Sequence, residues 1–129
     1  MLNQAEQTMI HKFVIKDKQE RYLGFIGKDK TRRKFTKELY HFKDFNWKMF
    51  REISGSENER DAIFAKVNGK KSIRTCQVVS ANAELDGKTI SVDEAIKSLV
   101  GEEGTILIFG NADVVYYEAE PFEGRYISK

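Results

Sequence analysis

The sequence predicts an α+β fold in which a helical N-terminal half packs on a small mixed β-sheet that carries one crossover helix. Apolar residues in the first half, about residues 1–68, recur at spacings of three and four, which is typical of amphipathic helices. Residues 73–117 instead follow the order β-α-β-β, and the sheet is expected within residues 72–129. A length of 129 residues predicts a single domain with its own core.

Helices are expected at three places in the first half. Apolar residues at helical spacing predict a helix over Asn3–Val14. Asp29 is placed to cap a second helix, whose polar face is strongly basic. Ser56 followed by Glu59 is a capping-box pattern and predicts a helix that runs to about Val67.

Two apolar segments between these helices are less regular. Residues 22–27 end in a glycine suited to the end of a helix, and residues 44–53 are core material, either as a further helix or as a packed connection. The chain contains nine Phe, five Tyr and one Trp. If all of them are buried, they form a substantial core against one sheet face. If some are exposed beside basic residues, they form an interaction surface.

The second half gives the clearest strand signals. Ile73–Ser80 is apolar on both faces, as expected of a strand covered on both sides. Ser91 and Glu94 form a second capping box before a periodic helix. Thr105–Phe109 is the apolar run of a central strand, and Val114–Tyr117 is expected to pair with it as an antiparallel hairpin. If the strands on either side of the helix are parallel neighbours, the crossover is right-handed. The segment after the only proline is expected to be a short edge strand or a tail.

Composition limits the class of protein. A hydrophobic fraction of 40% and a charged fraction of 33% are typical of a soluble globular protein. No window approaches the roughly eighteen apolar residues of a membrane span, and the first twenty or so residues are too charged for a signal peptide. Cys76 is the only cysteine, which excludes an intramolecular disulfide and a zinc site built on paired cysteines. We therefore expect a cytoplasmic protein without membrane contact.

Charge is divided unevenly along the chain. Residues 1–76 contain 18 Lys and Arg against 10 Asp and Glu, whereas residues 77–129 contain 4 against 10. One hypothesis is that the basic helix meets nucleic-acid phosphates. The other is that its cations are solvated or face an acidic sheet edge with Glu118, Glu120 and Glu123. The candidate basic surface consists of Lys28, Lys30, Arg32, Arg33, Lys34 and Lys37.

Recognisable catalytic and cofactor motifs are absent from the sequence. The glycines before Lys28 have the wrong spacing for a phosphate-binding loop, and neither a dinucleotide fingerprint nor a nucleophile elbow occurs. The two histidines, His11 and His41, and the scattered carboxylates show no metal-ligand spacing. No cofactor and no metal ion are therefore predicted.

A small set of residues remains as candidates for a pocket. His41 and Asp44 are three apart, so on a helix the carboxylate would orient the imidazole as a base. The paired tyrosines of the last long strand would face opposite sides of the sheet, so one of them could line a pocket. Each candidate also has a structural interpretation, as a helix-end histidine, a buried thiol or a core tyrosine. The pocket candidates are His41, Cys76, Tyr116, Tyr117 and Glu118.

Three functional hypotheses follow from these features. The first is a small non-enzymatic binding or regulatory protein whose partner is another protein or a second copy of the chain. It depends on the uneven charge, the abundant aromatic residues and the lack of a catalytic constellation. The second is nucleic-acid binding through the helix from about Lys30 to His41. The third is a small enzyme of unidentified reaction that uses the pocket candidates.

Overall fold

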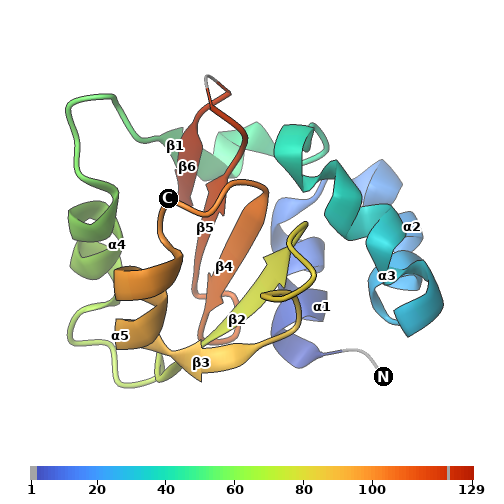
Figure 1. Ribbon diagram of the computed structural model, residues 1–129, viewed down its shortest axis with the longest axis horizontal. Coiled ribbons are helices and arrows are strands. Elements are labelled where there is room, and N and C mark those ends of the chain that lie inside the picture. The colour runs from blue at the N-terminus through green and yellow to red at the C-terminus, as the bar shows by residue number, and fades with distance from the viewer. Residues whose placement is uncertain (1–2, 122) are drawn as a thin grey trace.

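Six strands form one sheet at the centre of the protein, in the order β1-β6-β5-β4-β2-β3 (Figure 1). The computed structural model describes residues 3–121 and 123–129. Every pairing between neighbouring strands of this sheet is antiparallel. The strands are β1 (Phe50–Glu52), β2 (Thr75–Ser80), β3 (Thr89–Ser91), β4 (Thr105–Phe109), β5 (Val114–Glu118) and β6 (Arg125–Ser128).

The α+β class is confirmed, but the prediction of a mixed sheet is wrong. β2 and β4 are neighbours, yet they run antiparallel. The reason is β3, a three-residue strand that forms a hairpin with β2 and reverses the chain before the helix begins. The helical segment therefore leads from β3 across β2 to β4. β3 and β4 run parallel to each other and flank β2.

Helices cover both faces of the sheet (Figure 1). On one face lie α1 (Gln4–Phe13), α2 (Lys16–Ile26), α3 (Asp29–Thr36) and the 3₁₀ segment η1 (Lys37–His41). On the other lie α4 (Glu59–Val67) and the crossover segment, which consists of α5 (Val92–Glu94) and one π-helical turn, η3 (Ala95–Leu99). None of the helices described is long and apolar enough to cross a membrane.

Side chains cap the starts of α1, α4 and α5. The cap expected at Asp29 is wrong, because Asp29 is the first residue of α3 and no side chain among the described residues caps that helix. Asn3 caps α1 by accepting a hydrogen bond from the backbone of Glu6, and Ser91 accepts one from Glu94 as expected. The expected cap at Ser56 is wrong: Asn58 caps α4 by accepting from the Asp61 N–H at 3.0 Å. An Asn side chain one residue before the helix is a better acceptor for that N–H than a serine two residues further away.

The two less regular apolar segments, residues 22–27 and 44–53, adopt different structures. Residues 44–53 form a packed connection, with the 3₁₀ turn η2 (Trp47–Met49) leading into β1. β1 pairs with β6 at the edge of the sheet, so the final strand β6 is an inner strand and not the predicted edge. Residues 22–27 are the last turn of α2 and the residue that ends it.

The alternation of side chains along β4 explains its unbroken apolar sequence. Ile106 and Ile108 pack in the core beneath α1–α3, while Leu107 and Phe109 pack in the core beneath α4 and the crossover segment. Neighbouring residues on a strand face opposite sides, so a strand covered on both faces needs apolar residues throughout. The two-sided burial predicted for the strand β2 holds as well, since Val78 and Val79 lie in different cores.

Most aromatic side chains belong to the core beneath α1–α3. Phe35, Phe42 and Phe45, for example, are at most 4% exposed. The large apolar side chains that stay exposed, among the residues described, are Tyr40, Trp47, Met49 and Phe64. Trp47 is the one that lies in a cavity lined by other aromatic residues. Most of the aromatic residues therefore form core, and a few of those described lie at the surface.

Candidate functional site

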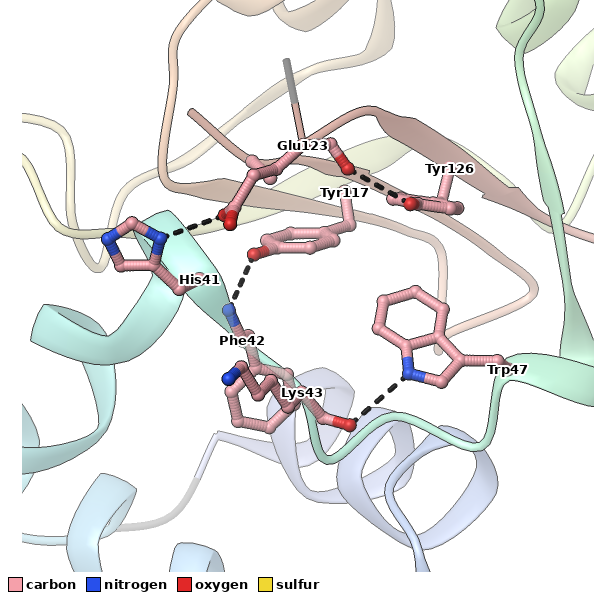
Figure 2. Close-up of a pocket in the computed structure, with 8 residues that line it drawn as sticks. His41, Phe42, Lys43, Trp47, Tyr117, Glu123 and Tyr126 are labelled. Carbon is pink, nitrogen blue, oxygen red and sulfur yellow. Dashed lines mark hydrogen bonds and ion pairs between the residues drawn. The ribbon is translucent and has the colours of Figure 1, made fainter. Parts of the chain in front are cut away.

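The candidate site lies at the end of β5, where η1 passes over the sheet, and its foundation is Tyr117 (Figure 2). This side chain is 1% exposed. Its hydroxyl donates to the Leu39 carbonyl at 2.5 Å and accepts from the Phe42 N–H at 2.9 Å. Burial raises the pKa of Tyr117 well above its ordinary value, so the hydroxyl keeps the proton that it donates. Tyr117 thus fixes the backbone on both sides of His41.

The turn that follows β5 brings two carboxylates to His41. The Glu120 N–H donates to the Tyr40 carbonyl at 3.1 Å, and the Glu123 N–H donates to the Glu120 carbonyl at 3.1 Å. His41 Nδ1 lies 2.8 Å from a Glu123 carboxylate oxygen and 3.2 Å from one of Glu120. The three side chains are 54%, 44% and 39% exposed for His41, Glu123 and Glu120, so solvent reaches the cluster.

The expected pairing of His41 with Asp44 is wrong. Helical geometry ends after His41, because Phe42 adopts an extended backbone with ψ of 123°. Residues three apart therefore no longer share a face. Asp44 instead accepts a hydrogen bond from the buried Tyr22 hydroxyl, and this bond contributes to a raised pKa of Tyr22, after the larger effect of burial.

A cavity of about 310 Å³ opens beside this cluster. Trp47 and Tyr126 form one wall, with ring centroids 4.7 Å apart, and Tyr126 stacks on Tyr117 at 6.2 Å with an interplanar angle of 17°. Figure 2 shows His41 and Glu123 across the cavity from Trp47. The residues that line it are His41, Phe42, Lys43, Trp47, Tyr117, Ala119, Glu123 and Tyr126.

Cys76 lies away from this cavity. Its side chain is fully buried in β2, in the core beneath α4 and the crossover segment. Burial raises the pKa of the thiol from 9.0 to about 12, so the thiolate is scarce near neutral pH. Cys76 and His41 are therefore not close together, and Cys76 is a buried core residue.

Tyr116 and Glu118 are also separated from Tyr117, because they project from the other face of β5. The Tyr116 hydroxyl donates to a Glu118 carboxylate oxygen at 2.6 Å, and that oxygen also accepts from the Gly101 N–H at 2.9 Å. Burial and this hydrogen bond raise the pKa of Tyr116. The two residues fasten β5 to the loop that follows η3, which is a structural role.

The basic surface is partly engaged within the protein. Arg32 forms ion pairs with Glu6 at 2.7 Å and with Asp86 at 2.6 Å. The Arg33 guanidinium donates to the Ala81 carbonyl at 2.7 Å. The Lys34 ammonium lies 5.6 Å from the centre of a phenylalanine ring. Lys28, Lys30 and Lys37 are exposed. Arg32 therefore contacts the acidic half of the chain through Asp86, and not through the expected sheet edge with Glu118, Glu120 and Glu123. The three lysines face solvent.

Several residues of the site were not identified as pocket residues from the sequence: Lys43, Trp47, Glu120, Glu123 and Tyr126. His41 and Glu123 are 82 positions apart, so no local spacing relates them. The sequence did indicate large apolar groups around Trp47 and an acidic strand end, but it gave no sign that they meet.

The lining of the cavity combines aromatic rings with the ionisable side chains of His41, Lys43 and Glu123. It offers aromatic faces for apolar or cationic groups, and an imidazole between two carboxylates. Comparisons with protein-family models, curated proteins and solved structures gave no significant match. Function is therefore inferred from the site itself.

Proposed function

We propose that this protein is a non-enzymatic cytoplasmic binding protein that docks a protein partner on the cavity beside Trp47. The observation that carries the proposal is Trp47 itself, whose side chain is 39% exposed while its ring packs on Tyr126 at the cavity wall. Tryptophan and tyrosine are enriched among the residues that dominate binding energy, particularly where they border a pocket. A rigid aromatic wall loses little conformational entropy when a partner binds.

The neighbouring surface favours a partner segment with basic residues. A second cavity of about 610 Å³ adjoins the first, and both are lined by Ala119. Glutamates dominate the charged residues of the second cavity, which are Glu52, Glu103, Glu118, Glu120 and Arg125. An acidic surface attracts a basic segment and accelerates its association. An apolar or cationic anchor on that segment would pack on the Trp47 and Tyr126 rings.

The other two hypotheses have weaker support. Nucleic-acid binding would depend on the exposed Lys28, Lys30 and Lys37. Arg32 is occupied by two carboxylates, and Arg33 is bonded to a carbonyl. Catalysis by Cys76 would require an accessible thiolate, and this thiol is buried. Nucleic-acid binding is tested by titrating duplex and single-stranded DNA at low and at high salt. Affinity should fall steeply as the salt concentration rises, because contacts to phosphates depend on salt.

The test compares Trp47→Ala with the matched variant Phe64→Ala. Phe64 lies on α4, on the other side of the sheet, and is an exposed aromatic residue outside the cavity, with 53% of its surface exposed against 39% for Trp47. Partners captured from cell extract by the wild-type protein are identified, purified and titrated by calorimetry. We expect Trp47→Ala to weaken binding at least about tenfold, as for a hot-spot residue, and Phe64→Ala to bind like the wild type.

The partner could be a second copy of the chain, and size-exclusion chromatography of the purified protein tests this form of the proposal. A dimer that dissociates in Trp47→Ala supports that form. The proposal is contradicted if the protein has neither a stable partner nor an oligomer, or if the two alanine variants bind a purified partner equally well.

A further inference from the structure

We propose that His41, Glu120 and Glu123 bind a divalent transition-metal ion, for which Zn²⁺ is the natural probe. His41 comes from η1, whereas Glu120 and Glu123 come from the turn between β5 and β6. His41 and Glu123 also line the aromatic cavity (Figure 2). This inference is independent of the proposed partner: the ion would bind to the protein alone.

The donor atoms are close enough for one ion. His41 Nδ1 and one carboxylate oxygen from each glutamate all lie within 4.8 Å of one another. The nitrogen is 2.8 Å from the Glu123 oxygen and 3.2 Å from the Glu120 oxygen. Zinc binds nitrogen and carboxylate ligands at about 2.0–2.2 Å, which places neighbouring ligand atoms roughly 3–3.5 Å apart. Small side-chain rotations therefore suffice to admit the ion.

The chemistry of the three ligands selects the class of ion. Two carboxylates and a neutral imidazole carry two negative charges, which balance a divalent cation. The imidazole favours zinc and similar transition metals over calcium and magnesium, which prefer oxygen ligands throughout. The ion binds Nδ1 only when that nitrogen carries no proton, so the ion competes with protonation of the imidazole and binding weakens in acid.

The backbone beneath these ligands is already fixed in place. The buried Tyr117 hydroxyl bonds to Leu39 and Phe42 on either side of His41. The Glu120 N–H bonds to the Tyr40 carbonyl. The Tyr126 hydroxyl donates to the Glu123 carbonyl at 3.0 Å. Because these bonds hold the ligand-bearing segments together, the ion has to order only three side chains, which lowers the entropic cost of binding.

Three protein ligands leave at least one coordination position open to solvent, as in zinc sites that exchange a bound water or substrate. All three side chains are partly exposed, and the cluster borders the cavity that contains Trp47. An ion here would present that open position to whatever enters the cavity. The site would therefore suit a ligand that carries a carboxylate or imidazole group.

The test uses tag-free, full-length protein treated with a chelator and then titrated with ZnCl₂ by calorimetry. Co²⁺ serves as a second probe, because its visible absorption reports coordination by protein ligands. It also quenches the fluorescence of Trp47, the only tryptophan in the chain. We expect one ion per chain and a loss of binding as the pH falls.

Matched variants decide whether these residues are the ligands. His41→Gln and Glu123→Gln should each weaken Zn²⁺ binding by about tenfold or more, since even residues that only orient a ligand have effects of this size. His11→Gln and Glu84→Gln remove an exposed imidazole and an exposed carboxylate elsewhere and should bind like the wild type. The proposal is overturned by non-saturating binding of both probes, or by equal affinity in all four variants. A failure of partner binding with Zn²⁺ binding intact would count against the proposed function alone.

Discussion

Arg32→Met tests whether Arg32 stabilises the fold or serves as a surface cation. The guanidinium joins three parts of the chain: Glu6 of α1 at 2.7 and 2.8 Å, its own helix α3, and Asp86 between β2 and β3 at 2.6 Å. Glu6 is only 1% exposed. Methionine fills much of the same volume but leaves the Glu6 carboxylate buried without its counterion.

The expected loss of stability can be estimated from this geometry. Removing one member of a buried ion pair costs about 3–5 kcal/mol, because the remaining charge stays desolvated. Arg32 is 17% exposed, so water reaches part of the site. Gln77 also continues to donate to the Glu6 carboxylate at 2.9 Å. We therefore expect the lower end of the range, about 3 kcal/mol. The exposed Lys30→Met is the control and should stay within about 0.5 kcal/mol of the wild type.

Urea unfolding at neutral pH measures the effect as a shift of the midpoint at constant slope. Adding Glu6→Gln to Arg32→Met removes the buried charge as well. The double variant should therefore be less destabilised than the sum of the two single variants, by about 1 kcal/mol or more. An Arg32→Met variant within about 1 kcal/mol of the wild type, or strictly additive effects, would refute a structural role for this ion pair.

Three further predictions concern buried groups. Tyr117→Phe removes the hydroxyl that bridges two backbone groups and should lower the free energy of unfolding in urea by about 1–3 kcal/mol. Tyr126→Phe loses only an exposed hydrogen bond and should lower it by less than about 1 kcal/mol. Similar losses in the two variants would argue against the bridge. Cys76 should react with a thiol reagent only when the protein unfolds, and fast labelling of the folded protein would contradict its burial. Because the folded-state pKa of this thiol is raised from 9.0 to about 12, the unfolded chain loses the proton first. The stability from this group is complete below pH 9 and is lost between pH 9 and about 12, by up to about 4 kcal/mol, so Cys76→Ala should show a shallower alkaline fall than the wild type.

Local features of the fold were predictable from the sequence, because their signals come from residues a few positions apart. The apolar run Thr105–Phe109 and the cap at Ser91 lie where they were expected, and the two-sided strand β2 begins at Thr75, two residues after the predicted start at Ile73. Each depends on periodicity or on a single side-chain bond to the next turn. Strand pairing was not predictable in this way. β1 and β3 have three residues each, too few to show a period, and β3 alone reverses the sheet direction that was expected.

The sequence by itself determined the α+β class, the principal elements and the uneven charge of the two halves. Only the tertiary structure decided how that charge is used. It turned Arg32 inward to Glu6 and Asp86, while lysines of the same helix remained in solvent. It also brought the turn after β5 to His41, 82 positions before Glu123. The physical reason is the same in both cases: local spacing fixes which face of an element a side chain occupies, but packing of distant elements fixes what that face meets.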